Sequence, residues 1–250
     1  YDSLNAVKEF DVYDIASITK ISSTIPLLMQ KVDAGTFDLD KRIRKYLNVE
    51  DTCSKGKLTS RKILAHQAQL WPWIPFYKET LTEKGDLNPE IYSDRQIDDF
   101  QVKVANDIFM NEAYLDTIFD RVIHSKMRKD KDYKYSDLGY YMLKEIIENQ
   151  EDASLKDMVQ DRIYEHLGAN FTSYHPLEKF DVKTIVPTEN DTYFRNQLLR
   201  GYVHDPGAAM QNGIGGHAGL FSNANDLAKL MQMYLNGGEY AGKRYIEEKT

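Results

Sequence analysis

The chain has 250 residues, of which 42% are hydrophobic and 28% are charged, a composition typical of a folded protein with a sizeable core. Its 39 acidic residues outnumber 32 basic ones, and the net charge of −7 argues against a nucleic-acid partner, which needs a concentrated basic face. No apolar run approaches the roughly 18 residues that span a bilayer. Cys53, the one cysteine, excludes an internal disulfide and is interpreted as a surface thiol.

Apolar residues recur every three to four positions after Ser17, which predicts an amphipathic helix that ends near Gly35. Pro26 lies inside this helix. Because proline has no N–H to donate to the carbonyl of Ser22, we expect a kink there.

The later segments of the chain also favour helices over strands. A less regular helix is predicted from Ser93 or Asp94 to about Asn106. Three regular amphipathic helices follow: one over Leu138–Ile147, one between a capping Ser154 and Gly168, and one from about Asn225 to Gly237. The short candidate strand is Lys183–Val186. The sequence therefore predicts a mainly helical chain.

The tetrapeptide Ser17-Ile18-Thr19-Lys20 opens the first predicted helix. Residues i and i+3 share a helical face, so the serine hydroxyl and the lysine amine can come within hydrogen-bonding distance. A serine is a strong nucleophile when a neighbour accepts its proton, and a helix N-terminus stabilises the developing alkoxide. The pattern favours acyl transfer, although a capping serine beside a solvated lysine has the same spacing. Ser54–Lys57 repeats the pattern in a charged loop.

Tyr135-Ser136-Asp137 directly precedes the helix that begins at Leu138, so the tyrosine is placed where a loop side chain can project into a cleft. A phenol close to a cationic lysine can act as a general base. The same tripeptide, Tyr-Ser-Asp, occurs at Tyr92–Asp94. Most of the 17 tyrosines are expected to be packing residues. Tyr135 is therefore a candidate because of its position.

Several ordered segments together resemble the serine β-lactamase and penicillin-binding protein superfamily, with the closest similarity to its class C β-lactamase and esterase branch. The resemblance runs from about residue 11 to 236, and such a set is far more specific than one Ser-x-x-Lys pattern. The matching segments are Asp14–Lys20, Val32–Gly35, Leu64–His66, Tyr135–Gly139, Gly168, Pro187–Glu189 and Gly216–Ser222.

The resemblance implies an α+β fold, with a helical subdomain over roughly residues 55–170 beside an antiparallel sheet flanked by helices. It implies a covalent acyl-enzyme on Ser17, with Lys20 activating the serine and Tyr135 moving protons in acylation and deacylation. Which of the two is the operative base stays open. It also implies a β-lactam, ester or D-alanyl-peptide substrate, no metal or organic cofactor, and an extracytoplasmic location in the bacterial envelope, periplasmic or membrane-anchored.

Two residues depart from the family pattern. Asp137 stands where the family most often has asparagine, in a position that contacts substrate. A carboxylate there repels an anionic substrate group while still orienting Lys20, which favours neutral esters or another acyl substrate. His66 is followed by Gln67-Ala68-Gln69 in place of small residues and glycine, and we interpret this histidine as structural.

The family's third motif, Lys-Thr-Gly or His-x-Gly on a strand that lines the cleft, is expected near the C-terminus. His217-Ala218-Gly219 matches the His-x-Gly pattern, but its glycine-rich flanks predict a loop before a helix. We therefore expect residues 1–250 to be one β-lactamase-like domain that is incomplete at both ends, with further strands beyond Tyr1 and Thr250.

The unmatched third motif and Asp137 also fit a second hypothesis, a penicillin-binding sensor or interaction domain that keeps the fold without turnover. The expected partner of the enzyme is a small acyl substrate or a peptidoglycan-type peptide. In some bacteria this type of domain follows a glycosidase in one chain, so a covalently linked glycosidase domain is an expected partner as well. The sequence makes no prediction of oligomeric state.

Overall fold

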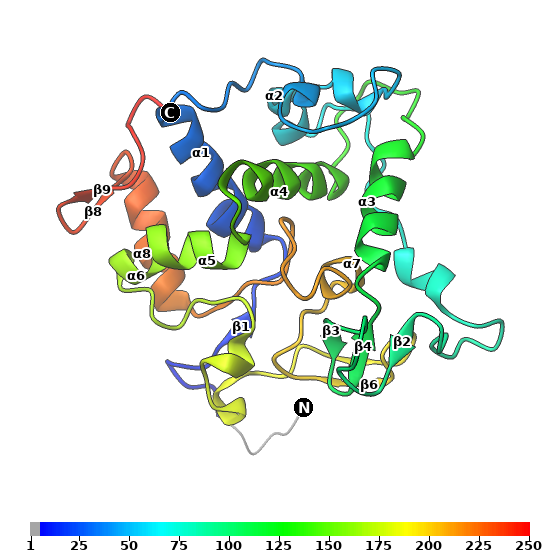
Figure 1. Ribbon diagram of the computed structural model, residues 1–250. Helices are drawn as coiled ribbons and strands as arrows, with labels where there is room; N and C mark the ends of the chain where they lie inside the picture. The colour runs from blue at the N-terminus through cyan, green and yellow to red at the C-terminus, as the bar shows by residue number, and fades with distance from the viewer. Residues whose placement is uncertain (1–5) are drawn as a thin grey trace.

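The computed structural model describes residues 6–250, and helices form most of its regular structure (Figure 1). The α-helices are α1 (Ile25–Asp33), α2 (Ser60–Leu64), α3 (Tyr114–His124), α4 (Leu138–Glu151), α5 (Leu155–Val159), α6 (Glu165–Leu167), α7 (Pro206–Ala209) and α8 (Ala224–Leu235). Two π-helical segments are η1 (Lys20–Thr24) and η5 (Gln160–Tyr164). The 3-10 segments are η2 (Ile43–Lys45), η3 (Lys55–Lys57), η4 (Phe76–Thr80), η6 (Pro176–Glu178) and η7 (Val182–Thr184). Over the described residues, no helix is both long and apolar enough to cross a membrane.

The strands are short and pair in small antiparallel sheets, which together with the helices gives the α+β class predicted from the sequence. One pair consists of β1 (Tyr13–Asp14) and β7 (Phe221–Ser222), and a three-stranded sheet has the order β2 (Tyr92–Ser93), β4 (Ile108–Met110), β3 (Val102–Ala105). The other pairs are β5 (Glu189–Asp191) with β6 (Gln197–Leu199), and β8 (Glu239–Tyr240) with β9 (Lys243–Arg244). Figure 1 shows the three-stranded sheet at one end of the molecule, close to β6 and away from α1, α5 and α8.

The first helix widens where the sequence predicted a kink. Segment η1 runs directly into α1, and Pro26 is in the first turn of α1. Proline cannot donate to the carbonyls of Ile21 and Ser22, which an N–H at position 26 would otherwise reach. Two tyrosine hydroxyls donate to these carbonyls instead: Tyr164 to Ser22 and Tyr234 to Ile21, each at 2.7 Å. The cost of the proline is thus offset by side chains from distant segments.

The regular helices were predicted correctly because their signals are local. Helix α4 begins at Leu138 and α8 begins within two residues of its predicted start. The Ser154 side chain caps α5 by accepting from the Asp157 N–H, and Gly168 ends the following turns with a φ of +65°. Helix α4 lies across the centre of the molecule and contacts η1 (Figure 1). The ion pair between Lys20 and Asp137 brings the beginning of the first helix to the residue before α4.

The helix predicted from residue 93 to 106 is wrong. This segment contains the last residue of β2 and all of β3, and these two strands flank β4. Val102 and Val104 are buried whereas Lys103 between them is exposed, and this period of two is that of a strand. Asn106 and Asp107 form a two-residue connection between β3 and β4. The capping residues Ser93 and Asp94 were given more weight than this short alternation.

Two smaller expectations also fail. Lys183–Val186 is not a strand: the Asp181 side chain caps the 3-10 turn η7, and Ile185 makes one bridge to Val12. Cys53 is not a surface thiol, because it is 8% exposed and packs against the carbonyl of Ile123 at the end of α3. A local cap therefore turns the chain at residues 182–184, whereas a distant segment covers Cys53.

The Tyr164 hydroxyl is expected to contribute measurably to stability. Tyr164→Phe leaves the buried Ser22 carbonyl without this donor and should lower the free energy of unfolding by about 1–3 kcal/mol, measured by denaturant titration. In a Pro26→Ala background, the new N–H can donate to Ser22, so the same change should cost at least about 0.5 kcal/mol less. Tyr133→Phe, at a side chain that is 61% exposed, is the control and should change stability by less than about 0.5 kcal/mol. Equal costs in both backgrounds would contradict this account of the proline.

Candidate active site

Ser17 stands at the end of a strand, on a tight turn into the first helix. Strand β1 pairs with β7, and the Ile15 N–H donates to the Leu220 carbonyl at 3.1 Å. Ala16 then adopts a φ of +46°, a conformation that is uncommon for a residue with a Cβ, and its N–H donates to Asp14 Oδ1 at 2.8 Å. The turn leaves Ser17 exposed at the helix start. The serine is therefore accessible while its backbone is held by the sheet.

Lys20 lies one helical turn further and is 3% exposed. Its Nζ donates to Ser17 Oγ at 2.9 Å and forms an ion pair with Asp137 Oδ1 at 2.6 Å. A third contact, at 3.3 Å, runs to the backbone carbonyl of His217. The structure thus brings Ser17, Lys20 and Asp137 together, in agreement with the expectation that a carboxylate at position 137 orients the lysine.

The segment that carries Tyr135 and Asp137 is fixed by its backbone and by Ser136. The Ser136 hydroxyl donates to the Trp71 carbonyl at 2.6 Å, and the Asp137 N–H donates to the Pro72 carbonyl at 2.8 Å. The Ser136 N–H donates to Nδ1 of His66 at 3.2 Å. Burial, assisted by the charge of Lys20, lowers the pKa of His66, which suits a ring nitrogen that accepts a hydrogen bond. These contacts are consistent with the structural interpretation of His66.

Tyr135 contacts the lysine through its ring. Lys20 Nζ lies 4.8 Å from the centroid of the Tyr135 ring and 5.3 Å from that of Tyr140. The Tyr135 side chain is 40% exposed and its ring packs against His66. Within residues 6–250, no hydrogen bond joins the Tyr135 hydroxyl to Ser17 or Lys20. Burial raises the pKa of the neighbouring Tyr140 to about 12, so Tyr140 stays neutral.

A glycine-rich loop closes the site behind Lys20, and its role was missed in the sequence. The Thr24 hydroxyl donates to the Gly216 carbonyl at 2.7 Å, which docks the loop on η1. A Cβ on Gly216 would lie 2.5 Å from the Tyr140 carbonyl oxygen, and a Cβ on Gly219, whose φ is +117°, would lie 2.2 Å from that of Gly213. Glycine at these positions therefore allows the His217 carbonyl to reach Lys20.

The loop also carries a hydrogen-bonded histidine–aspartate pair that the sequence did not reveal. His217, 2% exposed, lies with Nε2 2.8 Å from Oδ1 of Asp205, and its ring stacks on Tyr141 with centroids 4.7 Å apart. Burial alone would raise the pKa of Asp205, but the charge and hydrogen bond of His217, with the Ala208 N–H, lower it to about 2. Asp205 is therefore ionised at neutral pH. Its one sequence signal, an aspartate before Pro206, indicates a helix cap and nothing more.

As predicted, His217-Ala218-Gly219 is part of a loop and not of a strand, since β7 begins at Phe221. It nevertheless contributes to the site through the His217 carbonyl. The arrangement as a whole presents an exposed hydroxyl hydrogen-bonded to a buried amine, which in turn forms an ion pair with a carboxylate. This set of groups can generate a nucleophile and stabilise negative charge on it.

The chain is similar to known proteins over nearly its whole length. A family model described as Beta-lactamase matches residues 2–250. A putative D-alanyl-D-alanine carboxypeptidase of Salmonella paratyphi A is 30% identical over 256 residues, which cover 96% of this chain and 54% of that protein. An N-acetylmuramyl-L-alanine amidase of Bacillus subtilis (strain 168) is 29% identical over 262 residues, with coverage of 98% and 54%. The chain spans about half the length of the curated relatives it matches.

Solved structures share the fold at lower sequence identity. A class C beta lactamase from Rhodobacter sphaeroides has a TM-score of 0.60 and 16% identity, and the alignment covers 95% of this chain and 55% of that one. A structural match at this low sequence identity shows only that the two proteins share a fold. The family model covers nearly every residue, and the chain therefore belongs to the Beta-lactamase family.

Proposed function

We propose that this chain is a serine acyl hydrolase that forms a covalent acyl-enzyme on Ser17. The observation that carries the proposal is the 2.9 Å contact between the exposed Ser17 hydroxyl and the buried amine of Lys20. A capping serine beside a solvated lysine, the alternative raised by the sequence, does not account for a lysine that is 3% exposed. Membership in a family with hydrolase relatives supports the same reaction.

Acylation is proposed to start from the form of the Lys20–Tyr135 unit that lacks one proton. Ser17 Oγ forms a bond to the substrate carbonyl carbon, and the serine proton passes to this unit. The tetrahedral oxyanion is proposed to accept a hydrogen bond from the Ser17 N–H, which lies at the helix start, where N–H groups have no partner within the helix. When the intermediate collapses, the bond to the leaving group breaks and the proton is returned to that group. Water then attacks the acyl carbon, which releases the acid and restores Ser17.

The relatives suggest the substrate class, and Asp137 narrows it. One relative is named a D-alanyl-D-alanine carboxypeptidase and another an amidase, so a D-alanyl-type peptide or amide is the proposed substrate, with esters and β-lactams as reactive analogues. The carboxylate of Asp137 disfavours a substrate anion placed against it. Activity on cell-wall peptides would take place outside the cytoplasm, in the bacterial envelope, which is the location we propose.

Substitution of the serine should abolish acylation. Incubation with a fluorophosphonate or a penicillin should add one adduct to the wild type, located on Ser17 by intact-mass and peptide mass spectrometry, and none to Ser17→Ala. Lys20→Ala and Tyr135→Phe should each lower the acylation rate at least about 100-fold.

Ser54→Ala is the matched control, because Ser54 opens the second Ser-x-x-Lys pattern of the chain, outside the proposed site. It should label at the wild-type rate. Unchanged labelling of Ser17→Ala would exclude Ser17 as the nucleophile.

The non-turnover sensor remains the second candidate, and one observation favours it. Lys20 forms an ion pair with Asp137, and a charged amine has no lone pair with which to accept a proton. The lifetime of the Ser17 adduct distinguishes the hydrolase from the sensor. Release of product from nitrocefin or a p-nitrophenyl ester supports the hydrolase, whereas a persistent adduct supports the sensor.

Asp137→Asn should change selectivity between charged and neutral substrates. Removing the carboxylate leaves the Lys20 charge uncompensated, so acylation by a penicillin, which carries a carboxylate, should rise about tenfold relative to acylation by a neutral p-nitrophenyl ester. The ratio of the two rates, measured on the same preparation, is independent of the fraction of active protein. A ratio equal to that of the wild type would contradict the role given to Asp137.

A further inference from the structure

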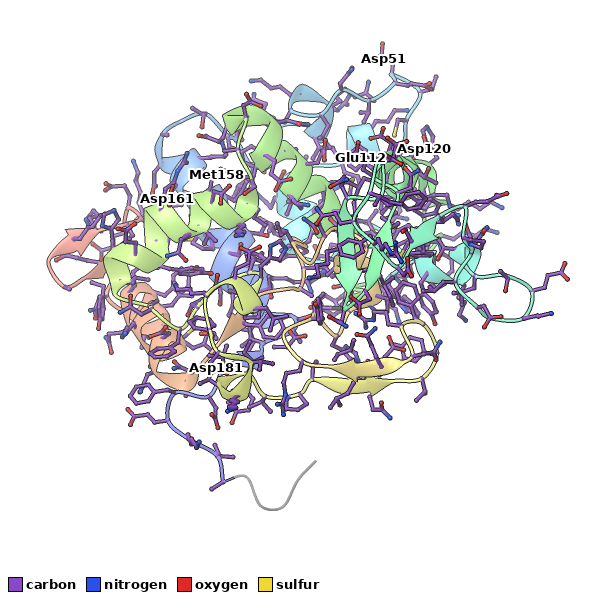
Figure 2. All side chains as sticks on the ribbon, turned by 60° about the horizontal axis from the view of Figure 1, so that its bottom comes forward. Asp51, Glu112, Asp120, Met158, Asp161 and Asp181 are labelled. Atoms are coloured by element: carbon purple, nitrogen blue, oxygen red, sulfur yellow. The ribbon has the colours of Figure 1, made fainter. Side chains whose placement is uncertain are left out.

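A cavity of about 330 Å³ borders the glycine-rich loop, and no group of the proposed Ser17 site lines it. Its lining residues come from β3, from η6, from residues 201–203 and from the two ends of the loop, Gly213 and Gly219. Figure 2 turns this side of the molecule forward and labels Asp181, between η6 and η7. A cavity of this size can hold a small organic molecule.

Much of the cavity wall is apolar. Leu177 is 37% exposed, and the ring of Tyr202 is partly buried beside it in the lining. An apolar ligand group that covers these side chains removes their surface from water, which is favourable. The apolar lining residues are Val104, Pro176, Leu177, Tyr202, Val203 and Phe221.

Two hydrogen-bond donors at the cavity have no acceptor among the described residues. Asn212 Oδ1 accepts from the Lys103 N–H at 3.0 Å, which fixes the orientation of the amide and leaves Nδ2 free. The Lys103 amine forms no ion pair within residues 6–250 and lies 5.7 Å from the centroid of the Tyr202 ring. Because Lys103 and Asn212 are bonded to each other and line one cavity, both donors are available to one ligand.

The negative charge at the cavity has its own partner. Glu178 forms an ion pair with Lys156, so its carboxylate does not compensate Lys103. His175 Nε2 donates to the Asn212 carbonyl at 2.5 Å, which fixes the backbone of Asn212 next to the loop. Lys103 is therefore the lining charge that lacks an oppositely charged partner in the part of the chain that the structure describes.

A carboxylate that carries an apolar group matches both features of this cavity. Its oxygens can accept from an ammonium and from an amide N–H, and such charge-assisted hydrogen bonds are strong. A cation would be repelled by Lys103. A purely apolar molecule would remove water from the donors without supplying an acceptor, and a small inorganic anion would leave Leu177 uncovered.

We propose that this cavity is a binding site for a small carboxylate with an apolar group of about the size of a phenyl ring. The carboxylate accepts from Lys103 Nζ and Asn212 Nδ2, and the apolar group packs on Leu177 and Tyr202. The site is separate from Ser17, and the proposal is independent of the hydrolase function, since binding can be measured whether or not Ser17 is acylated.

The test uses three probes that separate the two features of the ligand. 3-Phenylpropionate has both the charge and the ring, 3-phenylpropionamide lacks the charge, and acetate lacks the ring. Isothermal titration calorimetry at neutral pH should show one site for 3-phenylpropionate. Its Kd should be at least about tenfold lower than that of either other probe, because each of them loses one of the two contributions.

Two substitutions remove the donors one at a time. Lys103→Met removes the ammonium and keeps an unbranched side chain, and Asn212→Asp keeps an acceptor for the Lys103 N–H but replaces the free donor with an anionic oxygen. Each should raise the Kd of 3-phenylpropionate at least about tenfold. Lys45→Met is the matched control, because Lys45 is also an exposed lysine beside a ring, 5.9 Å from the centroid of Tyr46, and is outside the cavity.

The results that support and overturn the site are distinct. Binding that weakens in both cavity variants and keeps its wild-type Kd in Lys45→Met and in Ser17→Ala supports it. Equal affinity for the acid and the amide, an unchanged Kd in Lys103→Met, or no binding of 3-phenylpropionate at millimolar concentration overturns it. Loss of binding in Ser17→Ala would place the probe at Ser17 and overturn it as well. The hydrolase proposal is tested separately, by adduct formation on Ser17.

Discussion

The rest of the site depends on one buried amine. An ammonium removed from water loses several kcal/mol of hydration, and it is retained only when oxygen atoms replace the water. Lys20 finds these oxygens in three parts of the chain: the Ser17 hydroxyl, the Asp137 carboxylate and the His217 carbonyl. Because all three must reach the same nitrogen, the start of the first helix, the segment before α4 and the glycine-rich loop are fixed relative to one another.

The parts of this arrangement that the sequence predicted are those with short-range causes. The Ser17–Lys20 contact follows from a spacing of three residues on a helix, and the ends of α4 and α5 follow from periodicity and from a serine cap. The 93–106 segment failed because a strand of four residues offers few alternations, and its identity depends on pairing with β4. Cys53 failed for a similar reason, since the end of α3, some 70 residues away, covers it.

The parts that were missed depend on close approach of backbone. His217 reaches Lys20 across 197 residues of sequence, and it does so because Gly216 and Gly219 have no Cβ to keep the loop away. Neither glycine has a signal that distinguishes it from an ordinary turn glycine. Asp205 caps α7, and its pairing with His217 follows only once the loop has docked. For Asp137, family resemblance supplied the contact with Lys20 that the residues alone did not indicate.

The charges explain why an aspartate is compatible with position 137. Its carboxylate compensates Lys20, and Asp205 is held by His217, so each buried charge has a partner before a substrate arrives. The two partners are not equivalent, because the Lys20 amine also contacts Ser17, whereas the His217 ring pairs with Asp205 and stacks on Tyr141. Proton movement at Ser17 therefore changes the field at Asp137 directly and at Asp205 only weakly.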